Sequence, residues 1–176
     1  VIRAAAVNSD GRTTGIALPS GEAQAQLLKD VYEGAETGLD KSRIAYVEAH
    51  GTGTAVGDPV ETGAIGRVLG HREASQEPLV IGSVKGNLGH LETGSGMAGL
   101  AKALLTLQNR RIYPNLHFET PNPAIDFRAL GLRVATQIEP LSKVNGLPLV
   151  GINSFGFGGT NAHVVLEGCA AVSYTH

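Results

Sequence analysis

The feature that most constrains the fold is a pair of glycine-rich segments, each of which follows a β-branched run and contains a histidine. Residues 80–97, VIGSVKGNLGHLETGSGM, pass from such a run through Lys85 and His90 into a stretch of small residues. Residues 44–54, IAYVEAHGTGT, repeat the arrangement upstream with His50. A strand, a tight loop and a helix in this order present reactive side chains at the C-terminal ends of strands in α/β folds. The pattern predicts that His50 and His90 share one site.

The rest of the chain predicts an alternation of strands and helices. Strands are expected over residues 1–7, 44–49, 79–84, 132–135, 149–154 and 162–166. Helices are expected from about residue 19 to 37, 59 to 69 and 94 to 110, and the proline-rich residues 115–126 predict an ordered loop. This alternation, which ends in two strands, predicts a layered α/β fold with a mixed β-sheet in a single domain.

Composition limits the classes of function. The chain has 176 residues and a net charge of −2, which gives no electrostatic reason to expect binding to nucleic acid or to an anionic membrane. No apolar run is long enough for a membrane span, and no signal peptide is recognisable. The single cysteine, Cys169, excludes an internal disulfide and fits a reducing, cytoplasmic compartment. Because the sequence starts at Val1 in what reads as the middle of a strand, we interpret it as a fragment.

His50 is the first candidate for chemistry, because imidazole moves protons and donates hydrogen bonds near neutral pH. The glycines around it would let a ligand approach the backbone, and Thr52 and Thr54 add hydroxyl donors. A hydrogen-bonded core histidine beside a turn is the alternative. Near His90, Lys85 is placed to lower the proton affinity of an imidazole or to orient a carboxylate. Its alternative is a salt bridge, for example with Glu92.

Two other groups of residues have structural explanations. Asp58 and Glu61 flank Pro59 as a helix-capping box, so neither is predicted to be catalytic. A metal site of His50, His90 and Asp58 is disfavoured, because no short-spaced pair of ligands of the zinc kind occurs. The remaining histidines lie in turn, loop, strand and tail contexts and are interpreted as structural: His71, His117, His163 and His176.

Residues 151–163, GINSFGFGGTNAH, form a third glycine-rich segment. No helix is predicted after it and it lacks the lysine of a phosphate loop, so the freed backbone N–H groups fit an oxyanion hole better. Phe155 and Phe157 would act as apolar gates over a pocket or as core anchors. Cys169 lies outside any strand–helix elbow and is rejected as a nucleophile. The residues therefore indicate an acyl-transfer site without its nucleophile.

Three long motifs resemble the β-ketoacyl synthase family, and most closely the ketosynthase domains of modular type I polyketide synthases. They are VEAHGTGTAVGDPVE (47–61), GSVKGNLGHLETGSGMAGLAK (82–102) and GINSFGFGGTNAHVVLE (151–167). The resemblance implies a thiolase-like fold, of which residues 1–167 would be the C-terminal half. Residues 168–176 resemble nothing recognisable and are taken as a tail of unknown origin.

The resemblance also implies roles for the site residues. The family catalyses decarboxylative Claisen condensation of an acyl thioester with a malonyl-type extender on acyl carrier protein. His50 and His90 match its active-site histidines, and Lys85 matches the lysine that organises the site. Thr52 and Thr54 match threonines that bind the phosphopantetheine arm, which the carrier protein supplies, so no cofactor is expected to bind directly. Phe157, with Phe155 beside it, matches the gating phenylalanine, whose backbone N–H contributes to the oxyanion hole.

The nucleophilic cysteine of the family belongs to the N-terminal half, which this sequence lacks. The expected partners are therefore that N-terminal half and an acyl carrier protein, with a homodimer formed by the complete domain. Two other functions stay open: a non-elongating domain that only binds acyl chains, and an inactive structural fragment. The presence of both His50 and His90 argues against the first of these.

Overall fold

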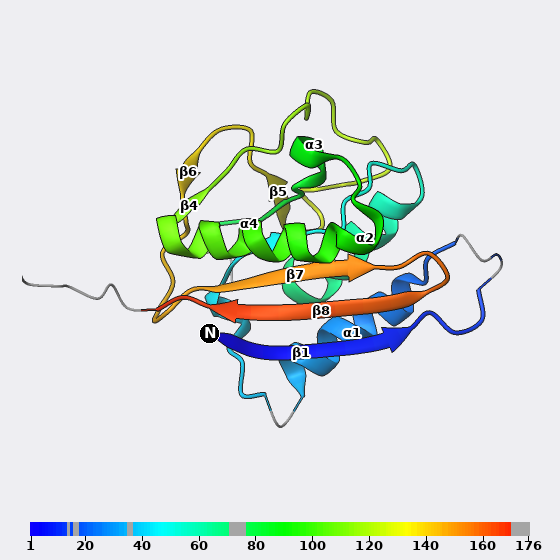
Figure 1. Ribbon diagram of the computed structural model, residues 1–176, viewed down its shortest axis with the longest axis horizontal. Coiled ribbons are helices and arrows are strands. Elements are labelled where there is room, and N and C mark those ends of the chain that lie inside the picture. The colour runs from blue at the N-terminus through cyan, green and yellow to red at the C-terminus, as the bar shows by residue number, and fades with distance from the viewer. Residues whose placement is uncertain (14, 16–17, 35–36, 71–76, 170–176) are drawn as a thin grey trace, which may run out of the picture.

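The computed structural model describes residues 1–13, 15, 18–34, 37–70 and 77–169. A six-stranded mixed sheet in the order β1-β8-β7-β2-β3-β5 forms its centre (Figure 1). The strands are β1 (Ile2–Ser9), β2 (Ile44–Glu48), β3 (Leu79–Gly82), β5 (Leu132–Val134), β7 (Leu149–Phe155) and β8 (Thr160–Glu167). β2 runs parallel to β3 and β7, whereas β8 is antiparallel to β1 and β7. A two-stranded sheet pairs β4 (Arg111–Ile112) with β6 (Glu139–Pro140).

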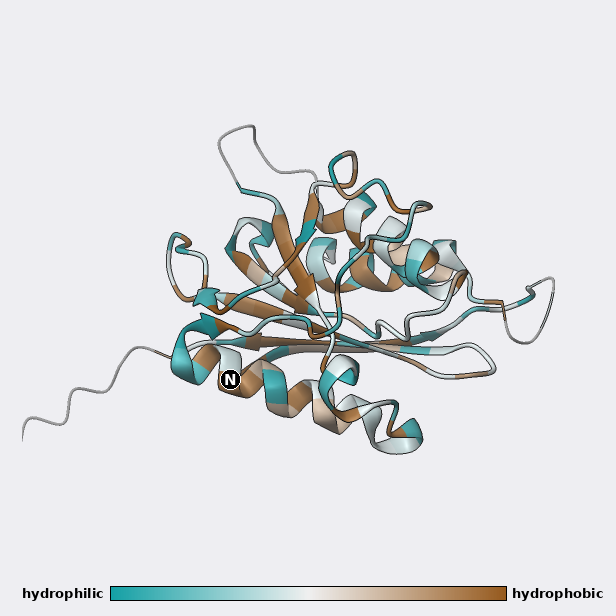
Figure 2. Ribbon diagram, turned by 90° about the horizontal axis from the view of Figure 1, so that it is seen from above, coloured by the Kyte–Doolittle hydropathy of each residue, from teal (hydrophilic) through white to brown (hydrophobic). Residues whose placement is uncertain are grey.

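Helices cover both faces of the sheet, which Figure 2 shows edge-on. Helix α1 (Gly21–Glu33) and helix α2 (Gly57–Ile65), which continues as a π-helical turn over Gly66–Gly70, lie on one face. Helix α4 (Ser95–Asn109) lies on the other face. The shorter helices are α3 (Lys85–Leu88) and the 3₁₀ turns Lys41–Arg43 and Glu92–Gly94.

Each face of the sheet has its own hydrophobic core, because successive side chains of a strand point to opposite faces. On β2, Val47 packs into the core shared with α1 and α2, and Tyr46 packs into the core shared with α4. All five residues of β2 are buried, as expected for a central strand that is covered on both faces. The predicted layered α/β fold with a mixed sheet is therefore confirmed.

The structure corrects the predicted capping box. Helix α2 begins at Gly57, and the N–H of this residue donates to Thr54 Oγ1 at 3.0 Å. The Asp58 carboxylate turns back to accept the Gly53 N–H at 3.0 Å, and Glu61 caps no helix. The reason is that the N–H groups of the glycine-rich loop need acceptors, and these two carboxylates are the acceptors within reach. The first helix also ends at Glu33, earlier than predicted.

Candidate active site

The sheet brings the two histidine segments together. β2 and β3 are parallel neighbours in a register that pairs Glu48 with Gly82, so both strands end at the same edge. His50 lies just beyond β2, and the chain leaving β3 passes through α3 to His90. The two imidazole rings meet edge to face, with their centroids 5.6 Å apart and their planes at 82°. The structure thus places His50 and His90 in one site.

The ring of His50 is held through its Nδ1 atom. This nitrogen accepts the Phe155 N–H at 3.3 Å and lies 3.5 Å from Lys85 Nζ. Burial, and then the positive charges of Lys85 and His90, lower the pKa of His50 to about 4. Because Nδ1 accepts, the hydrogen of the neutral ring is on Nε2, which is left as a hydrogen-bond donor.

His90 is held in the same way by different groups. Its Nδ1 accepts the Glu92 N–H at 2.9 Å and lies 3.1 Å from Ser95 Oγ, at the start of α4. His90 itself is exposed. In its neutral form it too therefore carries its ring hydrogen on Nε2.

Lys85 is the first residue of α3 and is half-buried. Its Nζ donates to the His50 carbonyl oxygen at 2.5 Å, so it touches both the backbone and the ring of that residue. Burial lowers the pKa of Lys85, and the carboxylates of Glu61, Glu48 and Asp58 oppose that effect. In the part of the chain that the structure describes, Lys85 forms no salt bridge with Glu92, so that alternative is not observed.

Glu61 is a site residue that the sequence reasoning missed. It is buried, its Oε1 accepts the His50 N–H at 2.7 Å, and its Oε2 accepts the Gly51 N–H at 2.8 Å. Asn153 Nδ2 donates to Oε1 at 2.9 Å. Burial raises the pKa of Glu61, while these three hydrogen bonds act to lower it. In the sequence, Glu61 stands about one helical turn after a glycine-rich loop. That position could have identified it as a site residue, but helix capping explains the position equally well.

A second buried carboxylate holds the end of β3. Glu48 is 1% exposed, and it accepts the Val84 N–H just before Lys85. Its Oε2 accepts the Tyr46 hydroxyl at 2.7 Å and lies 3.0 Å from Lys102 Nζ of α4. Gly99 of α4 lies close to this carboxylate, since a Cβ atom there would lie 3.3 Å from Glu48 Cγ.

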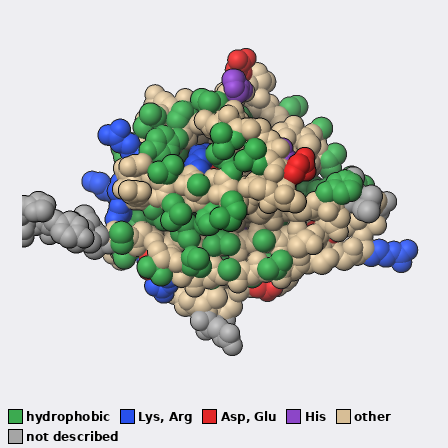
Figure 3. Space-filling model, viewed as in Figure 1, with side chains coloured by type: hydrophobic (Ala, Val, Ile, Leu, Met, Phe, Trp, Pro, Cys, Tyr) green, Lys and Arg blue, Asp and Glu red, His purple; other side chains and the backbone are tan. Residues whose placement is uncertain are grey.

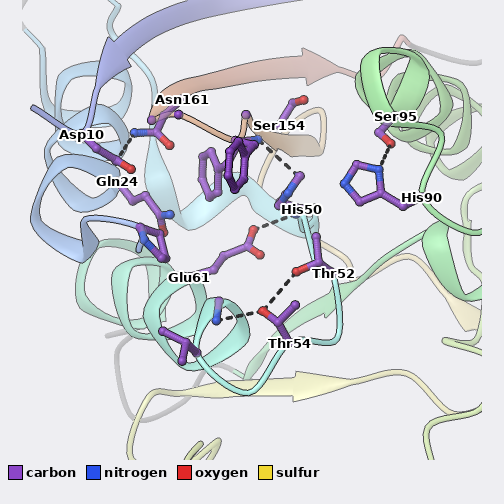
Figure 4. Close-up of a pocket in the computed structure, with 18 of the residues that line it drawn as sticks. Asp10, Gln24, His50, Thr52, Thr54, Glu61, His90, Ser95, Ser154 and Asn161 are labelled. Carbon is purple, nitrogen blue, oxygen red and sulfur yellow. Dashed lines mark hydrogen bonds between the residues drawn. The ribbon is translucent and has the colours of Figure 1, made fainter. Parts of the chain in front are cut away.

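The remaining predicted residues line one cavity of about 870 Å³ with the two histidines. Thr52 and Thr54 lie on its wall, with their hydroxyl oxygens 3.4 Å apart (Figure 4). The ring centroid of Phe155 lies 5.7 Å from that of His50. Phe157 is 83% exposed and so is not a core anchor.

Other candidates lie apart from this cavity. Cys169 is exposed and is not among the residues that line it. His163 is fully buried and hydrogen-bonded between Tyr32 and Asn153, as a structural histidine would be. His71 and His176 lie outside the described residues.

Within the described parts of the chain, no group of three or more His, Cys, Asp or Glu residues is placed to hold a metal ion. Likewise, no helix in those parts has the length and apolar character needed to cross a membrane.

Comparison with known proteins gives consistent matches along the chain. Residues 1–119 match the family "Beta-ketoacyl synthase, C-terminal domain", and residues 121–173 match "Ketoacyl-synthetase C-terminal extension". Highly reducing polyketide synthase Preu1 from Preussia isomera is 48% identical over 95% of this chain. Highly reducing polyketide synthase ZEA2 from Gibberella zeae is 50% identical over 95% of it. The chain spans only 7% of the length of each of these two relatives.

Solved structures agree with these matches. The ketosynthase from module 6 of the bacillaene synthase from Bacillus subtilis 168 superposes with a TM-score of 0.89 at 39% identity, covering 96% of this chain and 30% of that one. The oxazolomycin ketosynthase domain OzmH KS7 from Streptomyces albus gives a TM-score of 0.90 at 36% identity, covering 99% and 31%. The thiolase-like fold expected from the motifs is thereby confirmed. The chain belongs to the β-ketoacyl synthase family, and it corresponds to the C-terminal part of a polyketide synthase ketosynthase domain.

Proposed function

We propose that this chain supplies the two-histidine half of a condensing site that joins an acyl thioester to a malonyl-type extender. The observation that carries this proposal is the convergence of His50 and His90, each held at Nδ1 so that Nε2–H is the free donor. Two imidazole Nε2–H donors side by side are suited to an oxygen that gains negative charge during a reaction.

The chemistry follows from that arrangement. When the extender loses carbon dioxide, the electron pair of the breaking C–C bond moves into the thioester and forms an enolate. His50 and His90 would donate hydrogen bonds to the enolate oxygen. The enolate carbon then attacks the acyl thioester, a C–C bond forms, and the thiolate of the enzyme cysteine leaves with the electron pair of the C–S bond. Hydrogen bonds that strengthen as this charge develops lower the barrier rather than tighten ground-state binding.

The other predicted roles fit the same cavity. Thr52 and Thr54 are proposed to bind the phosphopantetheine arm of an acyl carrier protein, since both line the cavity that contains the histidines. Phe157 is proposed as the gate, and its high exposure leaves it free to move. Lys85 is proposed to organise the site, since it contacts the backbone and ring of His50.

The nucleophile is proposed to come from the N-terminal half of a ketosynthase domain. Figure 3 shows hydrophobic side chains gathered on the face that carries α4 and β1. Met97 and Leu104 of α4 and Val7 of β1 are each at least half exposed. Such a face is suited to burial against another protein layer. A homodimer of the complete domain and a cytoplasmic location stay predictions.

A chimaera tests this function. Residues 1–169 replace the matching C-terminal part of the bacillaene module 6 ketosynthase, to which the chain is 39% identical. The chimaera is given an acyl thioester and malonyl-loaded acyl carrier protein, and carbon dioxide release and product are followed by mass spectrometry. We expect condensation by the chimaera, and loss of decarboxylation in His50→Ala and in His90→Ala.

Cys169→Ser is the matched control, because this cysteine is exposed and outside the cavity. It should leave condensation unchanged. Acylation of Cys169 in the isolated chain, or full activity of both histidine variants, would contradict the proposal. An acylated but non-condensing chimaera would favour the acyl-binding alternative.

A further inference from the structure

A chain of buried hydrogen bonds runs from α1 to the His50 loop. It begins at Tyr32, whose hydroxyl lies 2.9 Å from His163 Nε2. His163 Nδ1 lies 2.6 Å from Asn153 Oδ1, and Asn153 Nδ2 donates to Glu61 Oε1 at 2.9 Å. Glu61 then accepts the backbone N–H groups at His50 and Gly51. Three regions that are distant in sequence, at residues 32, 50–61 and 153–163, are thus joined behind the cavity.

The order of protons along this chain follows from its inner end. Glu61 receives only N–H groups, so Asn153 must face it with its amide nitrogen and keep Oδ1 as an acceptor. His163 must then donate from Nδ1, which leaves Nε2 as the acceptor of the Tyr32 hydroxyl. Every donor points toward Glu61, and reversing any one bond would set two donors or two acceptors against each other.

Burial makes this order strict. His163 is fully buried and Tyr32 is 4% exposed, so water cannot replace a lost partner. Burial lowers the pKa of His163 to about 3, which keeps the ring neutral with a single hydrogen, and raises the pKa of Tyr32. Gly151 leaves the space for the contact, since a Cβ atom there would lie 2.9 Å from both the Tyr32 hydroxyl and His163 Cε1.

We propose that Tyr32, His163 and Asn153 are positioning residues, which fix the Glu61 carboxylate and through it the backbone that carries His50. The positioning role rests on the proposed function of His50. The hydrogen-bond order does not, and it is tested separately. A buried carboxylate at the end of three rotatable side-chain bonds would otherwise have alternative orientations, and each would release the His50 or Gly51 N–H. The chain from α1 removes that freedom.

The first test is the tautomer of His163, read from the ¹⁵N shifts of its ring nitrogens by long-range ¹H–¹⁵N NMR on the full chain. We expect Nδ1 to be protonated and Nε2 to be an acceptor. Protonation at Nε2 would overturn the proposed order, because Nδ1 would then face Asn153 as an acceptor and Asn153 would have to present its amide nitrogen to His163 instead of Glu61.

The second test removes only the outermost donor. Tyr32→Phe should move the Nε2 shift of His163 toward that of an acceptor without a partner, and should displace the His50 and Gly51 amide signals. Tyr46→Phe is the matched control, because it deletes another buried tyrosine hydroxyl that reaches a carboxylate, Glu48, on the opposite face of the sheet. If both variants moved the His50 and Gly51 amides equally, the proposed coupling would be wrong. Should Tyr32→Phe fail to fold, the tautomer of the unmodified chain decides alone.

The third test is kinetic and uses the chimaera. Asn153→Asp keeps the shape of residue 153 but replaces the N–H donor with an oxygen that faces Glu61. Because small displacements of a reacting group can lower the rate about 100-fold, we expect kcat to fall between about 10-fold and 100-fold with KM for the malonyl-carrier protein within about twofold. A fall confined to KM would contradict a positioning role. An inactive parent chimaera would count against the proposed function, while the two NMR tests would still decide the hydrogen-bond order.

Discussion

The two strand ends that form the site are secured differently. His50 lies two residues after the end of β2, and the buried Glu61 holds its backbone through the His50 N–H. Beyond β3, the chain is held at once by Glu48 through the Val84 N–H, but His90 comes later and is exposed. One histidine is therefore fixed from the core and the other from the surface by the start of α4. A rigid and an adaptable donor suit a site in which substrates are exchanged and one oxygen must be bound in a set place.

The largest effect is expected from the ion pair that secures the β3 end. Lys102→Met leaves the Glu48 carboxylate buried without its counter-charge, so the free energy of unfolding should fall by about 3–5 kcal/mol. Urea unfolding of the chain measures this. Adding Glu48→Gln to Lys102→Met should restore much of the loss, because the buried charge is then removed.

Lys41→Met is the matched control for that variant. The side chains of Lys41 and Glu33 are 41% and 46% exposed, against 10% and 1% for Lys102 and Glu48. Loss of the exposed pair should cost less than about 1 kcal/mol. Equal costs for the two lysine variants would show that the β3 end does not depend on Glu48.

A smaller effect is expected at the β2 end. Glu61→Gln keeps one acceptor oxygen but turns an amide group toward a backbone or Asn153 N–H, so the chain should lose about 1–3 kcal/mol of stability. The His50 and Gly51 amides should also exchange faster with solvent, while the Val84 amide at the other strand end should not. Faster exchange at both ends would contradict their independence.

The pH dependence of stability reports on His50. The unfolded chain binds a proton at His50 below its usual pKa of 6.5, whereas the folded chain binds it only below about 4. The free energy of unfolding should therefore fall as the pH decreases through this interval. His163, whose pKa is lowered to about 3, acts in the same direction. The substitution His50→Gln removes the contribution of His50 to this pH dependence and leaves that of His163.

The measurement is chemical unfolding of the chain and of His50→Gln at several pH values between 4 and 6.5. The difference in slope should stay below about 1.4 kcal/mol per pH unit, the limit for one proton, because His50 is only partly buried and solvent weakens the effect. Identical slopes would show that His50 does not resist protonation in the fold.

What the sequence could predict depended on local signals. The β-branched runs before His50 and Lys85 placed both residues at strand ends, and parallel pairing then made the shared site a consequence of the topology. The 13-residue helix α1 was recognisable because Ser20 caps it and its apolar residues have helical spacing. Short elements such as α3 and β4 carried too little pattern to be seen.

The supporting groups of the site could not be predicted, because they act over long sequence separations. Glu61 accepts from Asn153, which lies 92 residues away, and Tyr32 meets His163 across 131 residues. The local motif around Glu61 favoured a capping box, and only tertiary structure shows that the buried loop N–H groups take its carboxylate instead. Buried polar residues of this kind have no signature of their own until their partners are known.

The smallest effect is expected at the exposed histidine. Ser95→Ala removes one of two contacts at His90 Nδ1, while the Glu92 N–H remains to hold the same atom. The stability of the chain should change by no more than about 1 kcal/mol, and kcat of the chimaera by a small factor, because the tautomer of His90 is still set by the backbone. Urea unfolding and ¹⁵N shifts of the His90 ring measure both. If Ser95→Ala instead cost as much as Glu61→Gln, the surface-held histidine would be as rigidly fixed as the core-held one, and the contrast between the two strand ends would fail.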